Sequence, residues 1–159
     1  MTVKEAAEYL YDGLRLRTPP IGVKFLPDGS GFPEKTRRPL ETLGKRITIC
    51  QAVTLARVYG WNVGLTKKDL VCVPAMISFG FTRAGDQPAT LGKLFCNVSF
   101  GSTVESARSE AASMSLLENG SYSGIVLAPA AKDLFEPDTV AVYGNPAQIM
   151  RLIQGWTYL

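Results

Sequence analysis

The sequence contains no histidine, so any metal binding or nucleophilic catalysis must use sulfur, carboxylate or amine groups. Its three cysteines are the first candidates for that chemistry. Cys50 lies between Thr48 and Gln51, and Thr followed three residues later by Gln is the capping-box pattern that begins a helix. The pattern places Cys50 in the first helical turn, where free N–H groups and the positive end of the helix dipole stabilise a thiolate. A thiolate attacks electrophiles and binds metals, so Cys50 is the first candidate for chemistry.

The other two cysteines differ in the segments that carry them. Cys72 precedes Pro74, in a stretch where proline interrupts regular structure and leaves backbone N–H groups free to bond sulfur. Cys96 alternates in phase with apolar neighbours, so it is predicted to be a core residue and is the weakest of the three metal candidates. Sulfur-only ligation favours an iron–sulfur cluster, with a thiolate-rich zinc site as the second choice. The wide spacing is not the tight Cys-x-x-Cys pattern, so three unrelated core cysteines are the alternative.

A turn near the end of the chain is the second candidate site. Gly144-Asn145-Pro146 joins a predicted strand to a predicted helix, with Asn as the cap and Pro at the first helical position. Because such turns often bind phosphate or carboxylate groups, we expect Gly144, Asn145 and Gln148 to contact a ligand. A well-made helix cap with no ligand is the alternative interpretation. The sequence contains no nucleotide fingerprint, neither a Walker lysine nor Gly-x-Gly-x-x-Gly.

Both helices and strands must position these residues. At 159 residues and 46% apolar content, the chain is expected to form a single domain over residues 1–159. Helices and strands alternate, which predicts an α/β or α+β class with a mixed sheet of about four to five strands and flanking helices. Helices are predicted over 2–15, 49–59, 66–73, 74–80, 102–118 and 146–159, strands over 21–26, 62–65, 94–100, 124–129 and 139–143, a loop over 27–43 and a turn over 133–138.

Charge and hydropathy narrow the function classes. The net charge is +3, and the early basic cluster from Lys35 to Arg46 contains no aromatic residue, so it is predicted to be a solvated loop rather than a nucleic-acid surface. No run of about 18 apolar residues is present, and the N-terminus lacks a signal-peptide core, so we expect no membrane span and a cytoplasmic location with reduced thiols. The apolar last helix predicts a homodimer.

Five segments together resemble a known family. They are residues 16–25 (LRTPPIGVKF), 50–61, 69–81, 128–138 and 143–154. In this order they resemble the archaeal and anaerobe-rich family called domain of unknown function 169 (DUF169), whose name states that no activity is established. The resemblance implies cysteines at Cys50 and Cys72, whereas Cys96 matches no family motif. It also implies a longer family domain, whose C-terminal part often contains another cysteine, so this chain is expected to be its N-terminal portion.

Three functions are therefore predicted, and the sequence leaves open whether the protein is an enzyme. In the first, Cys50 and Cys72 hold an iron–sulfur cluster, or zinc, with Cys96, a C-terminal cysteine or a partner chain completing the site. In the second, the protein is a module that binds a small molecule or a protein, uses the turn from Gly144 to Gln148, and has structural core cysteines. In the third, Cys50 is the nucleophile of a thiol-redox or persulfide-carrying protein.

Overall fold

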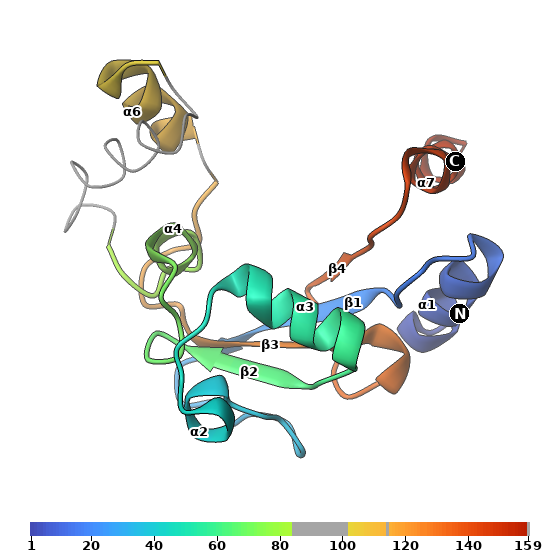
Figure 1. Cartoon of the computed structure of the whole chain (residues 1–159), viewed down its shortest axis with the longest axis horizontal. Helices are drawn as coiled ribbons and strands as arrows, with labels where there is room; N and C mark the ends of the chain where they lie inside the picture. The colour runs from blue at the N-terminus through green and yellow to red at the C-terminus, as the bar shows by residue number, and fades with distance from the viewer. Residues whose placement is uncertain (84–101, 114, 159) are drawn as a thin grey trace.

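A computed structural model describes residues 1–83, 102–113 and 115–158 of the chain (Figure 1). The predicted strand over 94–100, and Cys96 with it, lies outside the described residues. The described elements are, in chain order, α1 (Val3–Gly13), β1 (Ile21–Pro27), α2 (Pro39–Leu43), α3 (Ile49–Tyr59), β2 (Val63–Thr66), α4 (Val73–Ser78), α6 (Val104–Ser113), β3 (Tyr122–Pro129), the short 3-10 helix η2 (Ala130–Lys132), β4 (Thr139–Ala141) and α7 (Pro146–Thr157).

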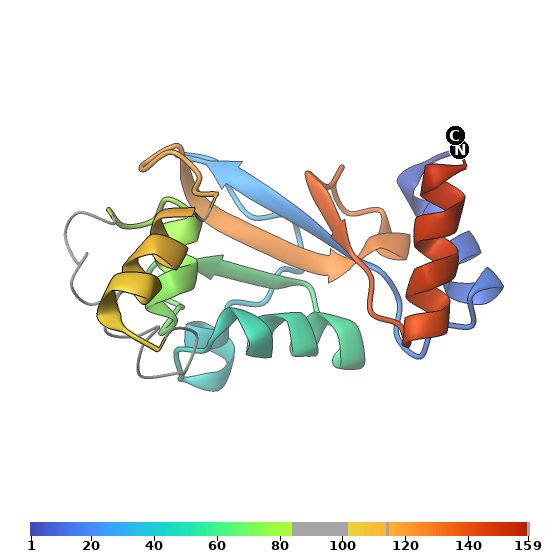
Figure 2. The ribbon, with the colours of Figure 1, turned by 90° about the horizontal axis from the view of Figure 1, so that it is seen from above.

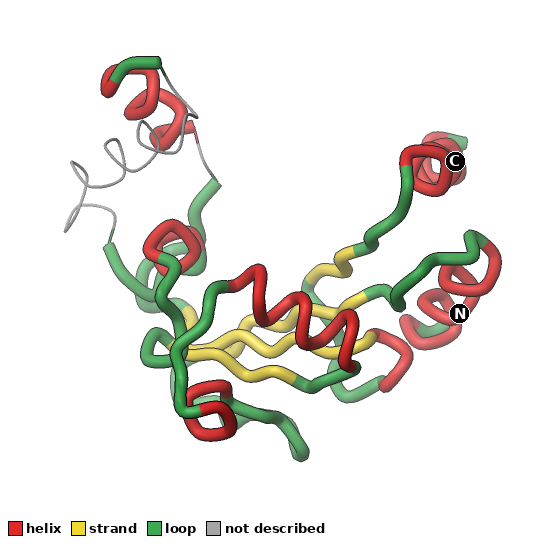
Figure 3. Tube along the Cα trace, viewed as in Figure 1, coloured by secondary structure: helices red, strands yellow, loops and turns green. Residues whose placement is uncertain are grey.

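A four-stranded sheet lies at the centre of the molecule, as Figure 3 shows in yellow. The strand order is β2-β3-β1-β4, and each neighbouring pair in it is antiparallel. The predicted class of mixed helices and strands, with about four strands, is confirmed. Because the pairs of this sheet are antiparallel and the helices pack around it, the fold is α+β.

The core lies between the sheet and α3. Alternate residues of the central strands point to this face, which gives Ile21, Val23 and the half-buried Phe25 one common side, as the period-two pattern of the sequence predicts. Ala52 and Ala56 of α3 are fully buried against it, and their small side chains let the helix approach the sheet closely. The other buried members of this core are Ile47, Val63, Leu65, Leu70, Met76, Ile125 and Leu127.

Loops rather than helices cover the opposite face of the sheet. The Phe32 ring lies over Gly64 and Gly124, where a Cβ atom at Gly64 would come within 2.8 Å of that ring. A Cβ atom at Gly22 would likewise meet Pro137 at 3.3 Å. The glycines of these strands therefore make room for the loops that close the second layer.

Three predicted helix starts are formed as the sequence indicates. Capping boxes join Thr2 to Glu5 in α1, Thr48 to Gln51 in α3, and Asn145 to Gln148 in α7. Gly60 ends α3 in the left-handed conformation with φ 66°, which favours glycine. These ends were predictable because each depends on residues within one helical turn.

Three predicted boundaries were wrong. No helix forms over 66–73, because Asp69 folds back on Thr66 in a turn and Ile47 then pairs with Leu70 as an extended bridge. The predicted loop over 27–43 contains α2, which begins with Pro39 at a position that suits proline. The helix predicted to reach Glu118 ends at Ser113.

The two ends of the molecule carry different helices. Figure 2 shows α1 and α7 side by side at one end, with α4 and α6 at the other. No residue of α7 is buried, and Met150, Ile153 and Trp156 expose about half or more of their surface. A helix of this length has little stability alone, so its contacts at the first turn fix its place.

Candidate anion-binding site

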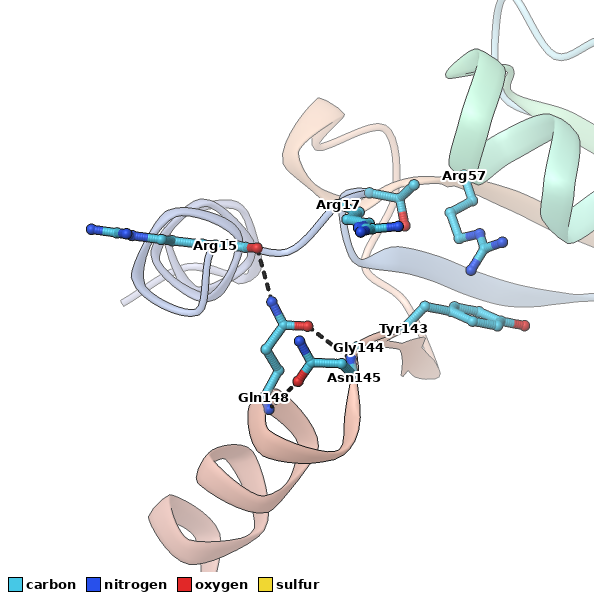
Figure 4. A pocket seen from close by; sticks show the side chains of 8 residues that line it. Arg15, Arg17, Arg57, Tyr143, Gly144, Asn145 and Gln148 are labelled. Carbon is cyan, nitrogen blue, oxygen red and sulfur yellow. Dashed lines mark hydrogen bonds between the residues drawn. The ribbon is translucent and has the colours of Figure 1, made fainter.

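A cavity of about 700 Å³ lies where the end of α1, the end of α3 and the connection from β4 to α7 meet (Figure 4). Its volume is typical of sites for small molecules. The lining residues are Arg15, Arg17, Thr18, Arg57, Tyr143, Gly144, Asn145 and Gln148. The three residues predicted to contact a ligand, Gly144, Asn145 and Gln148, thus lie together in one wall, and their role in binding stays a prediction.

Arg57 is the best positioned cation of the cavity. It lies in the last turn of α3, and its guanidinium group stacks on the Tyr143 ring with 4.0 Å between the guanidinium carbon and the ring centroid. The stacking fixes the plane of the guanidinium group while its edges stay free to donate. The Nε atom of Arg57 is buried and has no hydrogen-bond partner among the described residues. Because Nε lies beneath the accessible surface, a ligand oxygen would bond the Nη atoms, which donate to no described residue.

The other two arginines contribute differently. Figure 4 shows the guanidinium group of Arg17 on the same side of the cavity as that of Arg57, whereas the side chain of Arg15 points away from it. No Asp or Glu lines the cavity. Within the described part of the chain, no carboxylate lies within 4.0 Å of the cationic nitrogens of Arg17 or Arg57. The site therefore holds two positive charges that the described residues do not neutralise.

Gln148 builds the wall on the α7 side. Its Nε2 atom donates to the carbonyl oxygens of Leu14 and Arg15, both at 2.9 Å, and its Oε1 atom accepts from the N–H of Asn145 at 2.8 Å. Arg15 adopts φ 50°, a conformation uncommon for a residue with a side chain, and its carbonyl oxygen faces Gln148. These hydrogen bonds of Gln148 connect the start of α7 to the end of α1.

Asn145 has a free donor at the same wall. Its Oδ1 atom accepts the N–H of Gln148 at 3.0 Å as the helix cap, and its Nδ2 atom has no hydrogen bond to a described residue. Gly144 fits tightly beside it, since a Cβ atom there would lie 3.1 Å from the Cβ of Gln148. The wall thus offers a neutral donor and exposed backbone to a ligand.

The arginines were not predicted from the sequence. Arg57 lies at the opposite end of α3 from the capping box. No local sequence pattern indicates that it contacts Tyr143. The strand-to-helix turn, which the sequence did indicate, lies in one wall of the cavity.

The structure places two of the three candidate cysteines. Cys50 is the second residue of α3, is exposed, and opens into a smaller cavity of about 350 Å³ formed with Leu43, Ile47, Gln51, Thr54 and Leu55. Cys72 is half-buried and occupies the N-cap position of α4, where its side chain forms no capping hydrogen bond. Both are free thiols.

Backbone pairing brings the two cysteine segments together. The N–H of Ile47 donates to Asp69 at 2.9 Å, and the N–H of Val71 donates to Ile47 at 3.0 Å. The segments that precede Cys50 and Cys72 therefore run side by side. Among the described residues, no group of three or more His, Cys, Asp or Glu residues could hold a metal ion.

The early basic cluster is partly structural. Arg38 donates from Nη2 to Oδ2 of the fully buried Asp69 at 2.8 Å, and Arg37 stacks on the Trp61 ring at 4.5 Å. Burial alone would raise the pKa of Asp69, but hydrogen bonds from Arg38 and Thr66 outweigh it and hold the pKa below its ordinary value. These arginines stabilise the fold, so the prediction of a merely solvated loop was incomplete.

The chain is an α+β protein with a cavity lined, among the described residues, by three arginines and by no acidic residue. The chain belongs to the DUF169 family, described as uncharacterised ArCR, whose model matches residues 9–159. An uncharacterised protein of Methanocaldococcus jannaschii is 25% identical over 156 residues, covering 98% of this chain and 65% of that protein. The chain thus spans less than two thirds of the length of this curated relative. No solved structure matches it significantly. None of the helices in the described ranges has the length and hydrophobicity of a membrane span.

Proposed function

We propose that this protein binds a small anionic molecule in the cavity between α1, α3 and the β4–α7 connection. The observation that carries the proposal is Arg57, whose guanidinium group Tyr143 holds in place at the cavity while its Nη atoms donate to no described residue. Arginine recognises carboxylate and phosphate groups by paired, charge-assisted hydrogen bonds.

The positive charge of the cavity also supports a negatively charged ligand. Arg17 adds a second guanidinium group, and no lining residue is acidic. An anion entering the cavity would offset the mutual repulsion of the two arginines, which neighbouring described residues do not. The proposal assigns recognition to the arginines and orientation to Asn145, which the capping box with Gln148 holds in place.

A thermal-shift titration tests this function. Citrate and inorganic phosphate, each at constant ionic strength, are the probes. A ligand at 100 times its Kd adds about 2.7 kcal/mol, so we expect the midpoint of unfolding to rise by about 5 °C or more. The rise should shrink at high salt, because partly exposed charges are screened.

Two substitutions isolate the cavity. Arg57→Gln should abolish most of the rise, since one charge-assisted hydrogen bond is worth about 1.5–3 kcal/mol. Arg108→Gln on the exposed surface of α6 removes the same charge away from the cavity and should leave the rise unchanged. If both variants respond as the unmodified protein does, the anions bind elsewhere and the proposal fails.

A second function is favoured by the pairing of Ile47 with Leu70. This pairing supports thiolate ligation of an iron–sulfur cluster, or of zinc, by Cys50 and Cys72, with further ligands from elsewhere. The exposure of Cys50 also suits the thiol-redox or persulfide role. Each of these roles needs reduced thiols, which is consistent with a cytoplasmic protein.

Anaerobic purification followed by iron, sulfide and zinc analysis tests the metal proposal. We expect bound metal that is lost in Cys50→Ser and Cys72→Ser and kept in Thr54→Ser, a change on the same helix as Cys50 that keeps its hydroxyl. Protein without metal, in which Cys50 forms a mixed disulfide on mild oxidation, would instead support the thiol-redox role.

A further inference from the structure

The cavity contains two kinds of wall. The Arg17 and Arg57 guanidinium groups lie on one side of it, and Asn145 and Gln148 of the β4–α7 turn lie on another (Figure 4). The first wall carries the charge, and the second is neutral and polar. A ligand that fits both walls has its charge gathered at one end.

The size of the cavity argues against a bare inorganic ion. About 700 Å³ lies within the range of about 300–1,000 Å³ typical of small-molecule sites. An ion held by the arginines would leave most of that volume filled with water. A ligand that uses the site fully needs a body as well as a charged head.

The second wall determines the chemistry of that body. Gln148 has committed its amide to Leu14, Arg15 and Asn145, but the Nδ2 atom of Asn145 is free of partners within the described part of the chain. Thr18 adds a hydroxyl group, and Gly144 exposes backbone. These groups can exchange hydrogen bonds with hydroxyl groups of a ligand.

From these observations we propose that the ligand is a phosphate monoester of a small polyhydroxy compound. The phosphate group would lie between Arg17 and Arg57, and its hydroxylated body would lie against Asn145. A phosphate monoester carries close to two negative charges on one group at neutral pH, which matches two arginines on the same side of the cavity. This inference rests on the proposed anion-binding function and narrows its ligand class.

Calorimetric titration of the whole chain at fixed ionic strength tests the ligand class. The probes are glycerol 3-phosphate, ribose 5-phosphate, glucose 6-phosphate, inorganic phosphate, unphosphorylated glucose and glucarate, a hydroxylated dicarboxylate. We expect at least one of the three phosphate esters to bind ten-fold or more tightly than inorganic phosphate, and glucose to show no binding. Tighter binding of glucarate would overturn the ester and favour separated charges.

A matched variant tests the position of the body. Asn145→Ser keeps a residue that caps helices well but removes the Nδ2 donor. It should weaken the best ester at least three-fold and leave inorganic phosphate unchanged, whereas Arg57→Gln should weaken both. Equal affinity for phosphate and its esters would overturn the ligand class while leaving anion binding intact. Failure of every anion, citrate included, would overturn the proposed function itself.

Discussion

At the scale of single residues, the ion pair of Arg38 with Asp69 is an interaction that the local sequence pattern does not reveal. Asp69 is fully buried and accepts from Arg38 at 2.8 Å and from the N–H and hydroxyl of Thr66 at 2.8 and 2.7 Å. The sequence indicated an acidic residue in a helical first turn. A carboxylate that can bond a cation 31 residues away closes a turn instead. Local propensity could not reveal this, because the deciding partner is distant in the chain.

This ion pair predicts a defined pH dependence of stability. Since the folded state holds the pKa of Asp69 below its unfolded value of about 3.9, the stabilisation is complete above that pH and is lost as the pH falls through the lowered folded pKa. Asp69→Asn should lower the free energy of unfolding at neutral pH by about 1.5–3 kcal/mol, because it removes the charge-assisted hydrogen bond from Arg38, which keeps only Glu41 as its counter-charge among the described residues. It should also flatten the fall in stability between about pH 5 and pH 2.

Urea unfolding at a series of pH values measures both effects. Asp28→Asn is the control, because Asp28 is exposed and forms no ion pair with a described residue. A variant at Asp69 that keeps the full acid sensitivity of the unmodified protein would show that other carboxylates govern it.

At the scale of elements, the accuracy of the sequence predictions follows the range of the interactions. The three capping boxes and the glycine end of α3 were right because each depends on a few adjacent residues. The region 66–73 was predicted wrongly because the bridge between Ile47 and Leu70 draws it into extended structure. Pairing across the chain overrode a weak helical pattern there.

The attachment of α7 gives the prediction at this scale. Gln148→Ala removes the hydrogen bonds to Leu14 and Arg15 and the capping-box bond from the N–H of Asn145, each worth about 0.5–1.5 kcal/mol. Because no residue of α7 is buried, we expect its amides to lose most of their hydrogen-exchange protection while α3 keeps its own.

Gln154→Ala, on the same helix, is the control for that experiment. Gln154 bonds the side chain of Arg151 on the exposed surface, and its loss should leave protection in α7 nearly unchanged. Equal effects of the two substitutions would mean that the hydrogen bonds of Gln148 do not position α7.

At the scale of the whole molecule, the sequence located part of the site and the fold supplied the rest. The turn from Gly144 to Gln148 was a local signal, and it does form one wall of the cavity. Arg17 lies in the connection between α1 and β1, and Arg57 lies in the last turn of α3, so only the packing of these elements brings them to that wall. The homodimer stays a prediction, consistent with the exposed Ile153 and Trp156 of α7.

The central claim is that an anion accepts a hydrogen bond from Arg57 in this cavity. Heteronuclear NMR of the arginine guanidinium N–H groups, those of Nη included, during a titration with inorganic phosphate measures this bond directly. We predict a saturable downfield shift of the Arg57 signal, none for Arg108, and loss of the effect in Arg17→Gln, which removes the second charge. An Arg57 signal that stays unchanged while phosphate binds elsewhere on the protein would contradict the claim.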